Sequence, residues 1–388
     1  MRLTKTLSMV VATTLIPTGL LADGYERSNL DTSFLYESGS YAEFGMGRVA
    51  PSVPAKTLAG VRFQDNVAPS FVVRSAAVKA SIADNFDFGF WYTTSGNGVL
   101  IDWGSNFPAE GLTITADLNF PTLVGIAKYR VSENFSLLGG LKQVSIDGGS
   151  SVTLPISAAN IARADYSLST ASATTSVFGI AYEQPEIALR VELTAEGDTD
   201  LSVPATFNQT ASSEEGVTAN NQTGTIEAGV GDAVTLKFET GIAANTLLFG
   251  SVRHSKWKND QSFVPFVAFV PGGGGATVTT SGQVSDFGDS SSYTLGLGRR
   301  VNENISVSGS IYRSAGGNCD EDSALAPTCG NTAVSIGSKL NVFDNANLSL
   351  GLTWSQRGDA TIVSGGNELA QTGSSTVTSI GAKLSFNF

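Results

Sequence analysis

Residues 374–388, SSTVTSIGAKLSFNF, decide the fold that this sequence predicts. From residue 378 the side chains alternate, and one face carries Thr378, Ile380, Ala382, Leu384, Phe386 and Phe388. The other face is polar and includes Lys383. A period of two predicts a β-strand. An uncharged apolar face, a polar face and a final aromatic residue are typical of the closing strand of an outer-membrane β-barrel, although the last strand of a soluble β-sandwich could alternate in the same way.

The beginning of the chain predicts export. Arg2 and Lys5 form a cationic head, residues 7–21 are mainly apolar, and the sequence Leu20-Leu21-Ala22 is suited to cleavage. We therefore predict a signal peptide over residues 1–22 and exclude it from the fold. A retained membrane helix is the alternative, but polar residues, a proline and a glycine interrupt the run. No later segment offers about 20 continuous apolar residues, so we expect no membrane helix after it.

The composition narrows the class of protein. The chain has 43 glycines and only 15% charged residues, whereas a typical soluble domain has about 25%. The formal net charge is −12, and an acidic exported chain argues against nucleic-acid partners. Apolar residues that alternate with polar ones leave the average hydropathy ordinary, as in transmembrane barrels.

Short polar turns recur about every 40 to 60 residues along the chain. They lie at residues 84–85, 132–134, 184–186, 244–245, 302–304 and 344–345, each between two apolar or alternating runs. Longer segments rich in Gly, Ser, Thr and Asn lie between them. Short turns that alternate with long loops predict an all-β protein, a transmembrane antiparallel β-barrel of about 14 strands over residues 41–388.

Several predicted strands carry charges on one face. These residues are Arg190, Glu192, Lys237, Glu239, Lys339 and Lys383. A lysine or arginine facing lipid at the bilayer midplane costs about 2–4 kcal/mol, so we expect this face to point into the lumen. The charges could guide solutes, or they could simply neutralise one another inside a narrow barrel. The four tryptophans, Trp91, Trp103, Trp257 and Trp354, lie toward predicted strand ends and are expected in interfacial girdles.

Three stretches resemble the FadL-type long-chain fatty-acid outer-membrane transporters. They are residues 26–44 (ERSNLDTSFLYESGSYAEF), residues 181–191 (AYEQPEIALRV), and residues 246–253 (TLLFGSVR) joined with 295–304 (LGLGRRVNEN). The resemblance implies a fourteen-stranded barrel with a short N-terminal hatch inside it. It also implies that external loops capture apolar ligands, which pass to an inner site and leave sideways through a gap where the third strand kinks.

The resemblance assigns roles to particular residues. Residues 23–40 correspond to the hatch, and Phe34, Leu35 and Tyr36 are its expected contacts with the ligand. The Asn-Pro-Ala signature of many family hatches is absent here. The third predicted strand, residues 86–103, contains Gly96, Asn97 and Gly98. Glycine within a strand indicates a bulge or break, so these residues would form the lateral gap; a wide hairpin loop is the alternative.

Two loops carry further candidates. Phe263, Phe266 and Phe269 belong to an apolar run that could line the mouth of a ligand groove, extend a strand, or pack among loops as a plug. Residues 154–168 could form a short helix as another wall of that groove. The only two cysteines, Cys319 and Cys329, predict a disulfide in an exported protein rather than a redox or metal site.

An enzymatic role finds little support in the sequence. His254 is the only histidine, and a hydrolase would need it beside a serine and an orienting group. The spacing of residues predicts no catalytic site, no metal site and no cofactor. We expect a monomeric channel in the outer membrane of a Gram-negative bacterium, in contact with its lipid, for hydrophobic small molecules and above all long-chain fatty acids. Uptake of aromatic hydrocarbons, a structural or adhesive surface barrel, and a lipid hydrolase are the alternatives.

Overall fold

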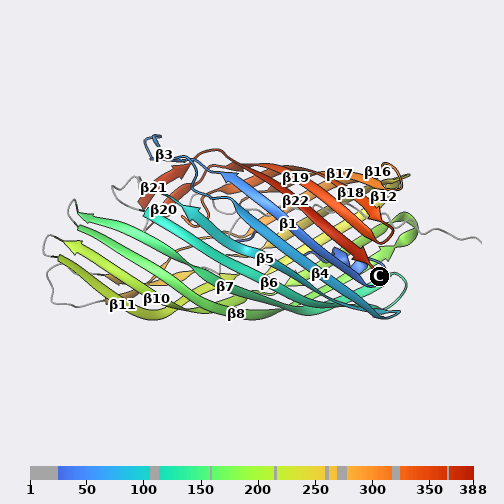
Figure 1. Cartoon of the computed structure of the whole chain (residues 1–388), viewed down its shortest axis with the longest axis horizontal. Helices are drawn as coiled ribbons and strands as arrows, with labels where there is room; N and C mark the ends of the chain where they lie inside the picture. The colour runs from blue at the N-terminus through green and yellow to red at the C-terminus, as the bar shows by residue number, and fades with distance from the viewer. Residues whose placement is uncertain are drawn as a thin grey trace, which may run out of the picture.

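The computed structural model describes residues 25–104, 113–157, 160–213, 216–257, 262–268, 278–316, 324–364 and 367–388. Fourteen antiparallel strands close into an elongated barrel (Figure 1). In their order around the barrel they are β1 (Tyr41–Ser52), β4 (Phe71–Ala83), β5 (Phe86–Asp102), β6 (Thr113–Arg130), β7 (Phe135–Ser157), β8 (Asn160–Gln184), β9 (Leu189–Glu196), β12 (Ala233–Ala243), β13 (Thr246–Ser255), β16 (Ser290–Arg300), β17 (Ile305–Ser314), β18 (Cys329–Phe343), β19 (Ala346–Gly358) and β22 (Ser375–Asn387). The predicted fold class and strand number are confirmed.

Strand β22 closes the barrel, as its alternation predicted. It pairs with β19 on one side and with β1 on the other, so no edge is left open at this seam. The amide of Phe388 donates to the carbonyl of Ser40 at 2.9 Å, which ties the two ends of the described chain together. On this strand Ile380 is 55% exposed toward the lipid side, whereas Ser379 is buried. A soluble β-sandwich does not have this arrangement.

All six predicted turns join neighbouring barrel strands at one end, which we call the short-turn end. The turn between β8 and β9 is a 3-10 helix, η2 (Pro185–Ile187), followed by Ala188 with φ 52°. Asn245 has φ 58° in the turn between β12 and β13, a left-handed conformation that asparagine tolerates. The local turn residues therefore account for the register of the hairpins.

The opposite end, which we call the long-loop end, extends beyond the closed wall. There β10 (Thr199–Ser213) and β11 (Gly216–Val230) continue the sheet beside the long arms of β7 and β8 (Figure 1). The hairpin of β14 (Phe263–Ala268) and β15 (Val278–Gln283) follows β11. A separate small sheet contains β2 (Ala55–Lys56), β3 (Arg62–Gln64), β20 (Thr361–Ser364) and β21 (Asn367–Thr372).

The prediction of a helix within residues 154–168 is wrong. The arms of β7 and β8 pair as far as Ser157 and Asn160, and β8 also pairs with β10 from Leu168 outward. Strand partners on both sides outweigh the weak local helical pattern of this segment. In the part of the chain that the structure describes, no helix is long and apolar enough to cross a membrane.

The two larger of three apolar clusters among the described residues lie at different heights in the barrel. The cluster at the short-turn end contains Phe34 and Leu35 of the 3-10 helix η1 (Ser33–Tyr36), packed among inward side chains such as Trp91. The larger cluster at the long-loop end contains Tyr25, Phe120 and Trp257. Residues 25–40, which we call the hatch segment, run along the inner side of the barrel and contribute to both clusters.

The girdle prediction for the tryptophans is wrong for three of the four. Trp91, Trp103 and Trp257 are 5%, 0% and 1% exposed and point inward, whereas Trp354 is 49% exposed on the lipid side. Proximity to a strand end does not decide which face a residue occupies. Trp91, for example, shares its face with the buried Thr93.

Candidate ligand-binding site

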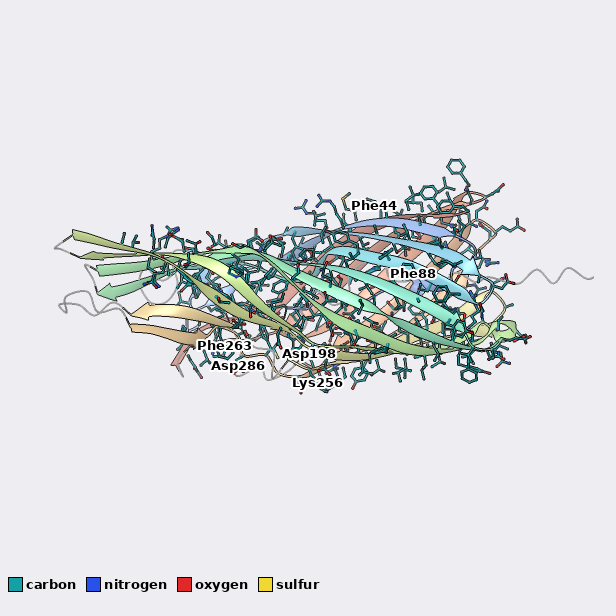
Figure 2. The ribbon with its side chains drawn as sticks, turned by 90° about the horizontal axis from the view of Figure 1, so that it is seen from below. Phe44, Phe88, Asp198, Lys256, Phe263 and Asp286 are labelled. Atoms are coloured by element: carbon teal, nitrogen blue, oxygen red, sulfur yellow. The ribbon has the colours of Figure 1, made fainter. Side chains whose placement is uncertain are left out.

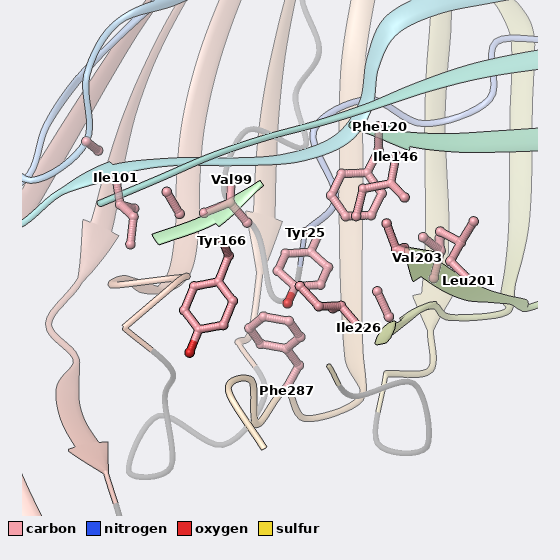
Figure 3. Close-up of a cluster of buried hydrophobic side chains, with 14 of the residues drawn as sticks. Tyr25, Val99, Ile101, Phe120, Ile146, Tyr166, Leu201, Val203, Ile226 and Phe287 are labelled. Carbon is pink, nitrogen blue, oxygen red and sulfur yellow. The ribbon is translucent and has the colours of Figure 1, made fainter. Parts of the chain in front are cut away.

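An aromatic cage surrounds Tyr25 at the start of the hatch segment (Figure 3). The ring of Tyr25 stacks on Phe120 at 5.4 Å and meets the edges of Phe287 at 4.7 Å and Trp257 at 6.1 Å. Its hydroxyl lies 2.7 Å from the hydroxyl of Ser262. Burial raises the pKa of the Tyr25 phenol, so this group stays neutral. The cage therefore offers apolar ring faces with one satisfied polar tip.

Aliphatic side chains complete the wall around this cage. They come from β5, β7, β10 and β11, and include Val99, Ile146, Leu201, Val203 and Ile226 (Figure 3). Each of them is nearly or fully buried. Apolar surface removed from water contributes about 25 cal/mol per Å², so these packed side chains stabilise the long-loop end of the barrel.

The third barrel strand breaks beside this cage. The ladder between β5 and β6 passes from the pair Thr93–Thr122 directly to the pair Asn97–Phe120. Three residues of β5 thus lie opposite Pro121 alone, which has no N–H to donate. On its other side, the ladder between β4 and β5 ends at the pair Ser75–Thr93. Beyond this point β5 diverges from β4, and Gly96, Asn97 and Gly98 lie at the divergence within the strand.

The hatch segment binds the edge of β5 that β4 leaves open. The amides of Arg27 and Ser28 both donate to the carbonyl of Gly96 at 2.9 Å, and the amide of Gly98 donates to the carbonyl of Tyr25 at 2.8 Å. Glu26 and Asn97 form the bridge between them. The first hatch residues therefore replace β4 as the partner of β5 where the wall opens.

The two glycines allow this close approach. A Cβ added at Gly96 would lie 2.2 Å from the hydroxyl of Thr122, and one at Gly98 would lie 2.8 Å from Nη1 of Arg27. Real Cβ atoms do not make such contacts without displacement of their neighbours. A cavity of about 20 Å³ lies next to the break, between the first hatch residues and strands β5 and β6.

The predicted lumen charges pair with each other and with the hatch segment. Arg190 lies 3.1 Å from Glu239, Lys237 lies 3.9 Å from Glu192, and Lys383 lies 2.8 Å from Glu43. Lys339 shares the inward face of its strand with buried residues of β18. Charges of both signs thus pair between neighbouring strands on the lumen side of the wall at the short-turn end.

Glu192 also anchors the hatch segment. Its two carboxylate oxygens accept hydrogen bonds from the hydroxyls of Thr32 and Tyr36, each at 2.5 Å. Lys237 donates to the carbonyl of Leu30 at 2.9 Å. The ring of Tyr36 is sandwiched between Lys128 at 3.7 Å and Arg190 at 4.1 Å, measured to its centroid. Cation–π contacts and charge-assisted hydrogen bonds together hold the segment to the wall.

A cavity of about 240 Å³ lies between the hatch segment and the wall. Its lining includes Asp31, Arg190, Glu192 and Lys237. Burial alone raises the pKa of Asp31, but the nearby Lys383 and Lys237 lower it overall, so the carboxylate remains charged. The lining also contains apolar side chains such as Trp91, Phe238 and Phe249, so charged groups and apolar surface share this cavity.

The predicted ligand contacts whose side chains the structure describes lie in different parts of the barrel. Phe34 and Leu35 are buried in the cluster at the short-turn end. Phe263 opens β14 and is 39% exposed, on the side of the molecule opposite Phe44 (Figure 2). The backbone of Phe266 belongs to β14, and Phe269 lies outside the described residues.

The structure describes one of the two cysteines of the predicted disulfide. Cys329 begins β18 and is 7% exposed, while Cys319 lies outside the described residues. The pairing of Cys319 with Cys329 therefore stays a prediction.

No pattern in the sequence singles out Tyr25, Phe120 or Phe287, and the position of Trp257 near a predicted strand end predicts an interfacial residue. The alternation of side chains along β6, the partner of the third strand, could have indicated Phe120, because Phe120 and Thr122 fall on one face. Tyr25 and Phe287 lie in irregular segments where no periodicity indicates burial. Only the folded chain brings these four rings together.

His254 lies on the outward face of β13, where its Nδ1 is 3.0 Å from the hydroxyl of Ser291. Within the described ranges, no third group is hydrogen-bonded to His254 in the way that orients a catalytic histidine. The geometry gives the hydrolase alternative no support.

The fold is shared with solved transporter structures. The toluene transporter TodX of Pseudomonas putida is 15% identical, with a TM-score of 0.68 over 99% of this chain and 98% of that chain. A FadL homologue of Pseudomonas aeruginosa is 10% identical, with a TM-score of 0.72 over 97% and 96%. The toluene transporter TbuX of Ralstonia pickettii is 13% identical, with a TM-score of 0.63 over 96% and 98%. No protein-family model matches the chain, and no curated protein sequence matches it.

These similarities place the chain in the class of fourteen-stranded β-barrels whose solved members include transport channels rather than enzymes. Within that class, the fold is the one of the FadL-type proteins, as the three sequence stretches predicted. Identities of 10% to 15% establish the fold, and the ligand has to be argued from the site.

Proposed function

We propose that this chain is an outer-membrane channel that takes up hydrophobic small molecules into a Gram-negative bacterium. The observation that carries the proposal is the aromatic cage around Tyr25 directly beside the break in β5. A ligand in this cage has two possible routes out of the barrel. The lumen at the short-turn end is charged and covered by the hatch segment, whereas the break leads sideways toward lipid. An apolar molecule gains more free energy by entering lipid than by crossing a charged lumen.

In lateral release, the break in β5 is the exit for the ligand. Gly96, Asn97 and Gly98 form the rim of the exit, and the first hatch residues cover it until a ligand displaces them. Because the first hatch residues are hydrogen-bonded to β5 at the break, release requires a movement of the hatch segment or of β4. We propose that this movement stays within one barrel, so that the channel works as a monomer in contact with outer-membrane lipid.

Long-chain fatty acids and aromatic hydrocarbons are both candidate ligands. Structurally similar proteins are described as toluene transporters, which favours a small aromatic molecule. The aliphatic wall that continues the cage along β10 and β11 favours a longer chain, because each buried CH₂ contributes about 0.8 kcal/mol. We keep fatty acids as the leading candidate, because this aliphatic wall extends beyond the rings along two strands.

The first experiment identifies the ligand and tests the cage. The barrel is purified in mild detergent, co-purified small molecules are identified by mass spectrometry, and displacement of a fluorescent fatty acid is measured. We expect saturable binding that Phe120→Ala weakens at least about ten-fold, since one buried aromatic side chain contributes more than 1.4 kcal/mol. Phe44→Ala is the matched control, because Phe44 is 55% exposed on the lipid side. Absence of binding to fatty acids, toluene and alkanes would favour a structural or adhesive surface protein.

The same assay distinguishes residues that capture the ligand, which change its association rate, from residues that bind it, which change its equilibrium affinity. Phe263 is exposed and lies outside the cage, so a role at the groove mouth concerns the rate of entry. Phe263→Ser, and the triple variant with Phe266 and Phe269 also changed to Ser, should slow association while the equilibrium affinity stays within about two-fold. Equal loss of affinity in these variants and in Phe120→Ala would place the loop in the binding site itself.

A further inference from the structure

We propose that Arg48 and Arg74 bind the phosphate of an outer-leaflet lipid on the outer surface of the barrel. The lipid would lie with its head group on the two guanidinium groups and its acyl chains along the apolar faces of β1 and β4. This site goes beyond the proposed uptake function, because its occupant is a lipid of the membrane and not the transported molecule.

The outward face of β22, β1 and β4 is apolar around the two arginines. Phe44 on β1 is 55% exposed, and Val78 on β4 is 50% exposed. Arg48 and Arg74 are exposed on this same face. The three strands, which are described in full, contain one acidic residue, Glu43, and it is buried on the lumen side. The two arginines therefore have no counter-charge on their own face of these strands.

The register makes the two arginines neighbours. In the ladder between β1 and β4, Arg48 lies opposite Val72, and Met46 lies opposite Arg74. Arg48 and Arg74 are thus diagonal partners, about 7–8 Å apart at their backbones, a distance that long side chains can span. Among the described residues, no ion pair joins either of them to a carboxylate. A phosphate between the two groups would relieve their repulsion, and the guanidinium fork matches its oxygens.

Both arginines lie toward the long-loop end of the lipid-facing band. One row beyond Arg48 in that direction, Ala50 lies opposite Thr378, which in turn lies opposite Trp354. Trp354 is 49% exposed on the lipid side, and tryptophan is enriched where hydrocarbon meets the head groups. Arginine side chains near this level can extend to the anionic head groups. Because long loops are external in such barrels, these head groups belong to the outer leaflet.

Arg74 also lies at the edge of the gap beside β5. Its amide donates to the hydroxyl of Thr94 at 3.0 Å, one residue beyond Ser75 and Thr93, the last pair of the ladder between β4 and β5. Beyond this bond, β5 is hydrogen-bonded to the hatch segment. A lipid held by Arg74 would therefore lie against the outer mouth of the gap.

The test measures lipid binding to the barrel purified in mild detergent, by native mass spectrometry. The probes are diphosphoryl lipid A and the same lipid without its phosphates, with inorganic phosphate as a competitor. The proteins are the wild type, Arg48→Met, Arg74→Met and Arg299→Met. Arg299 is the matched control, since it is exposed on the outward face of β16 at the short-turn end.

We expect Arg48→Met and Arg74→Met each to weaken binding of diphosphoryl lipid A about five-fold, and Arg299→Met less than about two-fold. Binding of the dephosphorylated lipid should be weaker in the wild type and equal in all four proteins. Methionine suits a lipid-facing position, so we expect the variants to fold, as judged by the heat-dependent mobility of the barrel in gels.

Three outcomes overturn the inference. In the first, all three variants weaken binding of lipid A equally, or none does. In the second, the wild type binds the dephosphorylated lipid as tightly as lipid A, a comparison that needs no variant. In the third, millimolar inorganic phosphate displaces lipid A, which would show a general anion site. These measurements use no transported ligand, so they decide the lipid site separately from the proposed uptake function.

Discussion

The hydroxyl of Tyr36 donates a 2.5 Å hydrogen bond to the carboxylate of Glu192 and so joins the hatch segment to the barrel wall. The two residues lie 156 positions apart in the sequence. Their contact is at the short-turn end, while the broken strand and the aromatic cage lie further toward the long-loop end. The hatch segment is thus fastened to the wall at its C-terminal part, while its N-terminal part is hydrogen-bonded to the broken part of β5.

Removal of the Tyr36 hydroxyl should loosen this fastening without removal of the ring. In Tyr36→Phe the aromatic face remains between Lys128 and Arg190, but Glu192 loses one donor. We expect a destabilisation of about 1–3 kcal/mol and faster proteolysis within residues 25–40. Thermal unfolding and limited proteolysis in detergent measure both effects. Tyr92→Phe, at a residue 40% exposed, is the control, and identical cleavage rates in the two variants would contradict the role of this bond.

Alkaline pH should loosen the same contact. Burial, and then the charge of Glu192, raise the pKa of Tyr36 well above its ordinary value. In the unfolded chain a tyrosine ionises near pH 10, so its contribution to stability is complete below about pH 10 and decreases as the pH rises further. The difference in unfolding temperature between the wild type and Tyr36→Phe should therefore be constant between pH 7 and 9 and shrink above pH 10. A difference that grows at high pH would exclude this explanation.

A larger side chain at the break should impair transport. Because a Cβ at Gly96 would lie 2.2 Å from the hydroxyl of Thr122, Gly96→Val must displace β5 at the rim of the gap. We expect uptake of a labelled hydrophobic ligand by cells to fall at least about five-fold. Gly139→Val on β7 is the control, since a Cβ there meets no atom within 4 Å. Normal uptake by a correctly folded Gly96→Val barrel would contradict release through this gap.

Reduction of the predicted disulfide should lower stability. A bond between Cys319 and Cys329 would close a short loop and contribute about 3 kcal/mol in the chain-entropy model. Unfolding in denaturant with and without a reducing agent measures this contribution, with Cys319→Ser/Cys329→Ser as the insensitive control. Equal stability under both conditions, or free thiols in the oxidised protein, would show that the bond is absent.

Much of the fold could be predicted from the sequence because its determinants are local. Alternation with a period of two identifies a strand and its lipid face, as in β22, where the outward Ile380 and the inward Ser379 follow one another. Polar turns such as residues 344–345 identify the hairpins, and their number gives the number of strands. Local position does not predict burial for the tryptophans, since Trp103 and Trp257 lie near strand ends and are buried.

The sequence by itself determined the strands, the turns, the inward charged face and a weak point in the third strand. Only the tertiary structure decided which inward residues meet, because alternation specifies a face but neither the neighbours around the barrel nor the height within it. Arg27 lies over Phe71, and Tyr25 stacks on Phe120, although 44 and 95 residues separate these partners in the sequence. Closure of the barrel and the path of the hatch segment bring them together, and the proposed ligand site depends on the contact between Tyr25 and Phe120.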